Sequence, residues 1–293
     1  MGKNNAWFLI LPALTAVGIL FFGGIFHGLL QSLGLSPLAG DADLTLENYR
    51  ILIVSHDFWR SFFLTLRIAL ISTFLSASLA IFALYSLFLI RIRSNRDKSV
   101  YFQRCFQISM LFPYIVAAYM IFLMFVQSGW IARILFNMGF ISGMNSFPII
   151  THEPFGWSII LAYVWKTSPF IVLLLYPLIL RVEDGWIEAA RVLGAGNFPI
   201  FREIVFPMMT RPLETASFIV FAYTFGAFEV PFILGVTYPK VLSVYSYQMY
   251  SSGDLSGHPM AMAINIMVLF ALLIAGAFYS ITTGSYFHRE DRS

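Results

Sequence analysis

The sequence has little of what a soluble catalytic domain needs. Charged residues make up 11% of its 293 residues, and it holds a single cysteine, Cys105. One cysteine excludes an intramolecular disulfide and every zinc site built from several cysteines. The histidines lack the spacing of metal ligands and predict no metal site. They are His27, His56, His152, His258 and His288.

Motifs for nucleotide and acyl chemistry are also missing. The chain contains no GxxxxGK[ST] loop, and the GAG of residues 194–196 is an incomplete dinucleotide fingerprint with no strand before it. No Ser/His/Asp or Cys/His constellation assembles from the available spacing. We therefore expect no catalytic residues and no cofactor in this chain, which is then not itself an enzyme.

Apolar and aromatic side chains are present in excess. The sequence is 59% hydrophobic, with 31 Phe, 14 Tyr and a mean hydropathy of +0.78. A water-soluble domain of this length could not bury so much apolar surface, which indicates a lipid environment. A spanning helix needs about 20 mostly apolar residues. Six segments qualify, namely 8–30, 62–89, 106–126, 159–180, 213–234 and 261–283. The sequence thus predicts an all-α membrane protein with six transmembrane helices.

Lysine and arginine are unevenly divided between the two sides of these spans. Twelve lie in the terminal segments and in the loops that share a side with them, and four lie in the opposite loops. Because cytoplasmic loops are enriched in positive charge, we expect both termini in the cytoplasm. This topology explains the basic pI without a nucleic acid partner. The first span is too long for the apolar region of a signal peptide, so we interpret it as an uncleaved helix.

The three loops expected outside the cell, 34–60, 128–157 and 236–260, are long and contain short aromatic pieces. Examples are LENYRILI at 46–53 and GWIARILFNMGF at 129–140. They are interpreted as interfacial helices packed on the bundle, as a docking surface for an external partner, or as both.

One cytoplasmic loop, EAARVLGAGNFPIFREIVFP at residues 188–207, is rich in small and charged side chains. Its pattern predicts a helix over 186–193, ended by the glycines of the 194–196 turn. Asn197 is expected to cap a second helix over 198–206, and Pro207 to mark a bend before the fifth span. The predicted result is a rigid helix, turn and helix suited to fitting a groove on a soluble partner.

The spacing of this loop resembles the EAA loop in the integral membrane subunits of binding-protein-dependent ABC importers. That pattern is EAA, three residues, Gly, nine residues, Ile, one residue and Leu-Pro. The chain departs from it at Phe206, where Leu is usual. The loop also lies at a fitting place, with Glu188 standing 105 residues before Ser293. The resemblance covers residues 60–285, and the segment 58–81 is similar to the opening core helix of that family.

The resemblance implies a type I ABC importer permease fold. It divides the chain into a first transmembrane helix (1–34), an external loop (35–60), a permease core (61–285) that carries the coupling loop 186–207, and a cytoplasmic tail (286–293). In that family the coupling loop docks into a cytoplasmic ATPase. The residues that match by position are Glu188, Ala189, Ala190, Arg191, Gly194 and Ala195 for docking, and Ile204, Phe206 and Pro207 for the junction with the membrane.

The partners that the resemblance implies follow from this assembly. They are an ABC ATPase dimer that binds ATP and Mg²⁺, a second permease subunit that is homologous or identical, and an external solute-binding protein. The implied location is the inner membrane. Two alternatives stay open: a self-contained secondary transporter or channel, and a receptor or scaffold that signals through the same loop. A secondary transporter commonly shows matched repeats in its two halves, and the sequence has no clear repeat.

Three ionisable residues, Arg67, Lys166 and Glu229, fall within or near the predicted spans. A charge at mid-bilayer costs about 2.5 to 3.5 kcal/mol on insertion scales, so such groups usually face a partner or water. Pro169 and Pro177 can open the helix of Lys166, and Gly226 and Pro231 that of Glu229. Either Lys166 and Glu229 pair with each other or lie at the outer interface, or they line the solute path. The residues expected on that path are Glu229, Lys166, Trp165, Tyr223 and Phe225.

An acid beside aromatic rings suits a cationic solute. The LGA of residues 193–195 is also more similar to permeases of the polyamine, opine, phosphonate, thiamine, iron and molybdate groups than to sugar permeases, which commonly have Asp before that glycine. We therefore predict a polyamine-like or other small polar solute. It would be moved by alternating access coupled to a separate ATPase.

Overall fold

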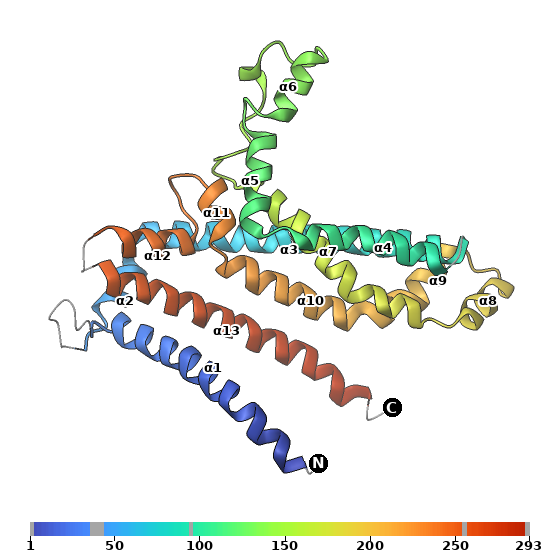
Figure 1. Cartoon of the computed structure of the whole chain (residues 1–293), viewed down its shortest axis with the longest axis horizontal. Helices are drawn as coiled ribbons and strands as arrows, with labels where there is room; N and C mark the ends of the chain where they lie inside the picture. Colours follow the sequence, from blue (N-terminus) through green and yellow to red (C-terminus); the bar gives the residue numbers. More distant parts are fainter. Residues whose placement is uncertain (1–2, 36–43, 94–95, 254–256, 291–293) are drawn as a thin grey trace. The chain divides into compact units, whose positions relative to one another are not determined.

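Figure 1 shows the computed structural model of the chain, which describes residues 3–35, 44–93, 96–253 and 257–290. Every regular element in these ranges is a helix. Six helical stretches are long and apolar enough to cross a membrane, which confirms the predicted number within the described residues. They are Ile10–Ser32, His56–Arg93, Tyr114–Asn137, Trp157–Arg181, Asn197–Gly226 and Gly257–Ile281.

The chain folds as two compact units, and the first combines Met1–Ser61 with Leu242–Ile274. Its helices are α1 (Lys3–Ser32), α2 (Glu47–Val54), the start of α3 (His56–Arg93), α12 (Leu242–Ser251) and most of α13 (Gly257–Glu290). The end of α1 is tied to α2, because the hydroxyls of Ser32 and Tyr49 lie 2.6 Å apart. Ser246 of α12 donates to the carbonyl of Ala261 in α13 at 3.0 Å. The sequence-based boundaries at 34, 60 and 285 stay predictions.

The second unit, Phe62–Val241 with Ala275–Ser293, holds both candidate sites. After α3 come α4 (Arg96–Leu111), α5 (Tyr114–Phe125), α6 (Trp130–Asn137), a 3₁₀ turn (Met144–Ser146), α7 (Trp157–Arg181), α8 (Asp184–Val192), α9 (Asn197–Ile200), a π-helical turn (Phe201–Val205), α10 (Phe206–Gly226) and α11 (Glu229–Leu234). Helix α7 is central, because it packs against α4, α5, α10 and α11. It therefore connects both ends of the unit.

Two of the predicted spans are interrupted. The span predicted at 106–126 is two helices, because α4 ends at Leu111 and α5 begins at Tyr114. Pro113 stands in the gap, where it has no N–H to continue the helix and disfavours helical backbone at Phe112. The span predicted at 213–234 breaks between Gly226 and Glu229, which confirms the expected loosening there.

The expected opening of α7 at its prolines is wrong, since the helix is continuous from Trp157 to Arg181. Pro169 lacks the N–H that would bond the carbonyl of Trp165 four residues earlier. The hydroxyl of Ser109 in α4 donates to that carbonyl instead, at 3.2 Å. A neighbouring helix therefore satisfies the freed carbonyl, and α7 continues past this proline.

Candidate functional site

The first candidate site is the loop of α8 and α9. Both helices lie at one end of α3, α4, α7 and α10, away from α5 and α6 (Figure 1). The structure begins α8 at Asp184, directly after the two-residue connection from α7, and ends it at Val192, so the helix predicted over 186–193 is confirmed with shifted ends. An acidic residue in this first turn is favourable next to the positive end of the helix dipole.

A Schellman motif closes α8. Gly194 has a positive φ of 85°, which a glycine adopts without a Cβ penalty. Its N–H donates to the carbonyl of Arg191 at 2.9 Å, and the N–H of Ala195 donates to that of Ala190 at 2.9 Å. These are the two bonds of the motif, and the side chains of Ala190 and Ala195 pack against the same core. The small residues of this loop thus terminate the helix in a defined way.

The second half of the loop differs from the prediction. Gly196 is the N-cap of α9, and Asn197 is already helical and makes no side-chain cap bond, so the expected Asn197 cap is wrong. The second helix does not end at Phe206 as predicted, because α9, the π turn and α10 follow one another without a break, and the bend expected at Pro207 stays a prediction. The π turn places Pro207 in the first turn of α10, where a residue without an N–H is tolerated.

The loop has an inner and an outer face. The inner face is buried against α3 and α7 in one apolar cluster, to which the loop contributes Ile187, Ile200, Phe201 and Val205. Among the residues expected to dock to the ATPase or to form the junction with the membrane, four are partly buried against this cluster: Ala190, Ala195, Ile204 and Phe206. The others, Glu188, Ala189, Arg191, Gly194 and Pro207, are exposed. The predicted docking residues therefore divide between supporting the loop and presenting its surface.

Sequence reasoning missed the apolar part of the outer face. Val192 and Leu193 are 88% and 87% exposed at the end of α8, and Trp186 is about half exposed. Large apolar side chains grouped on a soluble surface commonly mark an interaction site. The sequence contains a signal for this exposed apolar surface, because Trp186, Val192 and Leu193 fall on the polar side of an otherwise amphipathic helix.

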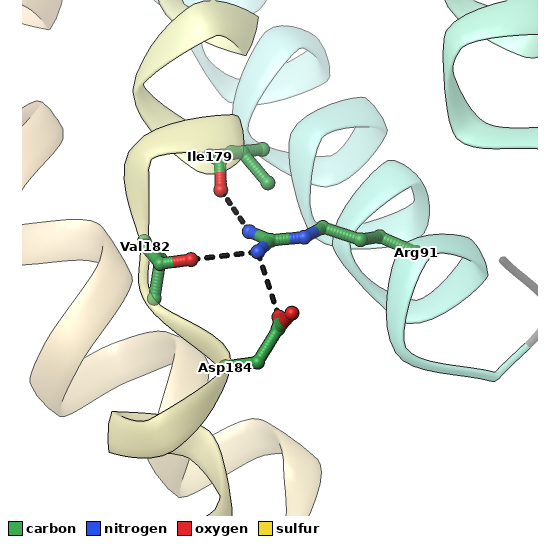
Figure 2. Close-up of polar contacts among 4 residues, drawn as sticks. All are labelled: Arg91, Ile179, Val182 and Asp184. Atoms are coloured by element: carbon green, nitrogen blue, oxygen red, sulfur yellow. Dashed lines mark hydrogen bonds and ion pairs between the residues drawn. The ribbon is translucent and has the colours of Figure 1, made fainter. Parts of the chain in front are cut away.

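Sequence reasoning also missed Arg91, which lies near the end of α3 and contacts the base of α8. Figure 2 shows its guanidinium facing the carbonyls of Ile179 and Val182 and the carboxylate of Asp184. These partners lie 88 to 93 residues away in the sequence, so no local pattern points to them.

The second candidate site lies at the break between α4 and α5. The ammonium of Lys166, on α7, donates to the carbonyls of Ser109 and Phe112 at 2.6 and 2.7 Å. Ser109 lies in the last turn of α4 and Phe112 directly after it, where no further helical turn can donate N–H groups to these carbonyls. Lys166 also lies 5.1 Å from the centroid of the Tyr114 ring. The buried cation is therefore held by backbone carbonyls and an aromatic face.

Three tyrosines and one carboxylate gather beside this break, and we call them the tyrosine cluster: Tyr114, Tyr163, Tyr223 and Glu229. The rings of Tyr114 and Tyr223 are 4.6 Å apart and their hydroxyls are hydrogen-bonded, while Tyr163 lies 6.5 Å from Tyr223. Glu229 is exposed and lies within electrostatic range of all three. The hydroxyl of Tyr163 is buried without a hydrogen-bond partner among the described residues.

The residues expected on the solute path are thus only partly brought together. Tyr223 and Glu229 belong to the tyrosine cluster, and Lys166 lies next to it. Trp165 faces Phe112 at 6.2 Å, and Phe225 is buried against Phe62 at 6.0 Å. Sequence reasoning missed Tyr114 and Tyr163, although a tyrosine inside an apolar span is a signal because its hydroxyl needs a partner.

Arg67, the third ionisable residue of the predicted spans, is held by contacts with the loop before α7. Arg67 of α3 donates to the carbonyls of Pro154 and Phe155 at 3.0 and 3.1 Å, and its guanidinium lies 4.3 Å from the centroid of the Phe155 ring. These contacts hold the loop that precedes α7. Among the described residues, no group of three or more His, Cys, Asp or Glu could hold a metal ion.

Comparison with known proteins relates these features to a family. The family of binding-protein-dependent transport system inner membrane components matches residues 86–283. A probable sulfate transport system permease protein cysT of Prototheca wickerhamii is 29% identical over 175 residues, covering 57% of this chain and 65% of that protein, which is under two thirds of its length. The inner membrane ABC transporter permease protein YdcU of Escherichia coli K12 is 27% identical over 288 residues, covering 91% of this chain and 87% of that protein.

The fold is that of known importer subunits. A chain from the crystal structure of a bacterial ABC transporter involved in the import of the acidic polysaccharide alginate superposes with a TM-score of 0.78, at 17% identity, over 96% of this chain and 95% of that one. This confirms the expected type I importer permease fold, while the orientation of the termini stays a prediction. The relatives are membrane translocation components and not enzymes.

Proposed function

We propose that this chain, which belongs to the family of binding-protein-dependent transport system inner membrane components, is a permease subunit in the inner membrane whose α8 docks into a separate ATPase. The assembly holds two such ATPases with ATP and Mg²⁺, a second permease, homologous or identical, and an external solute-binding protein. ATP binding and hydrolysis move α8, and the bundle alternates between inward-open and outward-open states. This chain supplies the path and no covalent chemistry.

The observation that carries this proposal is the two-sided construction of α8. Its inner residue Ile187 is 3% exposed, whereas Val192 and Leu193 on the outer face are 88% and 87% exposed. The Schellman closure at Gly194 holds this outer face in one conformation, which lowers the entropy cost of docking. Glu188 adds a carboxylate that can receive a charge-assisted hydrogen bond from the partner. The surface therefore combines apolar contact with one charge.

Affinity purification of the tagged chain from its native membrane tests the docking role. We expect an ABC ATPase and a second permease to be retained with the wild-type chain. Glu188→Lys should reduce the retained ATPase at least tenfold, because the charge at the docking face is reversed, and should leave the second permease in place. Glu203→Lys is the matched control, because it makes the same charge change at another exposed position of the loop.

Three outcomes contradict the docking role. A lone chain that transports without an ATPase supports the secondary transporter or channel. A complex with a signalling protein in place of the ATPase supports the receptor or scaffold. Equal loss of ATPase in Glu188→Lys and Glu203→Lys would show that α8 is not the specific contact.

For the solute we propose a small cation of polyamine type, bound at the tyrosine cluster. Aromatic faces attract cations, and Glu229 supplies an exposed carboxylate within electrostatic range of the neighbouring Tyr114 and Tyr223. The nearby ammonium of Lys166 is stabilised, with its charge retained, by the two carbonyls that it binds. The names of the relatives give this choice no support, since that of YdcU mentions no solute and the others refer to sulfate and alginate. The proposal therefore rests on the side chains alone.

A further inference from the structure

We propose that Arg91 is a positioning residue that joins the base of α8 to the ends of α3 and α7, so that a displacement of α8 is passed to these two membrane helices together. This inference rests on the proposed docking of α8. It concerns the transmission of movement and not the docking contact itself, because Arg91 is buried and does not belong to the outer face of the loop.

The geometry is a three-way contact made by one guanidinium (Figure 2). Arg91 Nη1 donates to the carbonyl of Ile179, and Nη2 donates to the carbonyl of Val182 at 2.6 Å and to Asp184 Oδ1 at 2.9 Å. The side chain of Arg91 is 5% exposed. One residue of α3 therefore contacts the last turn of α7, the connection after it and the first turn of α8.

These contacts satisfy groups that the helices cannot satisfy themselves. Helix α7 ends at Arg181, so in its last turn the carbonyl of Ile179 receives only a long bond from the N–H of Val182, at 3.4 Å, and the carbonyl of Val182 lies beyond the helix. A cation there also faces the negative end of the helix dipole, while Asp184 faces the positive end of α8. The fork of donors on a guanidinium can bond two carbonyls and a carboxylate at once, which the ammonium of a lysine cannot reproduce in the same plane.

The rest of the joint is apolar and leaves α8 little freedom. Val182 and Ile187 are 1% and 3% exposed and belong to the same cluster as Phe88 of α3. Only Val182 and Glu183 separate α7 from α8. Without Arg91, α8 stays attached through this short connection and through Ile187, but its angle to α3 is no longer fixed by hydrogen bonds. The ATPase would therefore still dock, but a displacement of α8 would no longer be passed to α3 and α7.

The carbonyl bonds matter more than the ion pair. The side chain of Asp184 is 81% exposed, so its attraction to Arg91 is weakened by water. Removing Arg91, in contrast, takes the donor from the buried carbonyl of Val182 and leaves that of Ile179 with only the long bond from the N–H of Val182. We therefore expect Asp184→Asn to behave nearly as wild type and Arg91→Met to be strongly impaired, whereas an ion-pair role would make the two variants equally defective.

The experiment uses the purified complex of the permease with its ATPase. In a Cys105→Ser background, Gly226→Cys gives a single cysteine at the α10 break, where an added Cβ meets no atom within 4 Å. Three quantities are measured: the ATPase retained, the rate of ATP hydrolysis, and the change in labelling by a water-soluble maleimide when ATP and vanadate are added. Arg93→Met is the matched control, because Arg93 is exposed on the same helix.

Arg91→Met should keep the retained ATPase and its hydrolysis within about twofold of wild type and lose the ATP-dependent change in labelling at least tenfold. Arg91→Lys should lose it partly, and Arg93→Met and Asp184→Asn should keep it. The inference is overturned if Arg91→Met keeps the labelling change, or if both Arg91→Met and Arg91→Lys fail to assemble, which marks a purely structural residue. If the wild-type complex retains no ATPase or shows no labelling change, the proposed function itself fails.

Discussion

The two candidate sites are built in opposite ways. The loop of α8 and α9 is a run of neighbouring residues, and its decisive bonds, from Gly194 and Ala195 back to α8, span three and five positions. The tyrosine cluster draws its members from α5, α7, α10 and α11. A site made of consecutive residues can be recognised from spacing, whereas a site made by four helices depends on how these helices pack. The proposed docking loop is therefore encoded by neighbouring residues, whereas the proposed solute site depends on the packing of four helices.

The largest effect is expected from a change at Gly194, in the turn that closes α8. Asp and Asn both tolerate the left-handed backbone of Gly194, so each variant keeps the turn at a small cost. Gly194→Asp adds a negative charge to the docking face and should reduce the ATPase retained on the purified complex at least tenfold. Gly194→Asn has the same shape without the charge and should retain most of it. Equal losses would show that the turn, and not the docking surface, controls the assembly.

A smaller effect is expected at the tyrosine cluster. Glu229→Gln keeps the shape of the side chain and removes its charge, so uptake of labelled spermidine into cells should fall about tenfold, or about 1.4 kcal/mol. The ATPase retained with the permease should not change, because α11, which begins at Glu229, lies away from α8 (Figure 1). Glu214→Gln is the matched control, since Glu214 is an exposed acid on α10.

The results of this experiment also test the class of solute. Unchanged spermidine uptake in Glu229→Gln would reject the role of the carboxylate. Uptake of labelled sulfate, but not of spermidine, by the wild-type protein would reject a cationic solute. It would instead favour an anionic solute of the kind named for the sulfate permease relative.

The smallest effect concerns the helix that connects the two sites. Ser109→Ala removes the donor that satisfies the Trp165 carbonyl freed by Pro169. The loss of one such bond should lower stability by about 1 kcal/mol, seen as a slightly lower unfolding midpoint of the purified protein in detergent. Ser86→Ala is the control, because the Ser86 hydroxyl bonds only within its own helix, to Phe82. An equal change in both variants would mean that Ser109 does not support α7.

Much of the fold could be predicted because hydropathy is a local property. The number of spans was confirmed, as were the first helix and the glycine turn of the coupling loop and the break near Glu229. The expected helix end at Phe206 was wrong because the helix continues through a π turn into α10, which holds Pro207 in its first turn. The opening of α7 at Pro169 was wrong because the compensating donor, Ser109, comes from another helix.

The parts that sequence reasoning missed depend on distant residues. Arg91 was read as one of several cytoplasmic charges that set the topology, yet its partners lie 88 to 93 positions further on. Tyr114 and Tyr163 were counted among many aromatic residues, and only packing places them beside Glu229. The docking and solute-path residues stay predictions, now with defined positions: an exposed helix face for the first and a cluster at two helix breaks for the second.

The central claim is that α8 contacts an ATPase, and the single native cysteine allows a direct test. In a Cys105→Ser background, Val192→Cys places a thiol on the outer face of α8, and Met138→Cys places one just after α6, a helix that lies away from α8 in the same unit (Figure 1). Each purified complex is treated with a short bismaleimide or photoactivatable maleimide crosslinker. The account predicts that Val192→Cys is joined to the ATPase and Met138→Cys is not; an ATPase joined to neither, or to both equally, would contradict it.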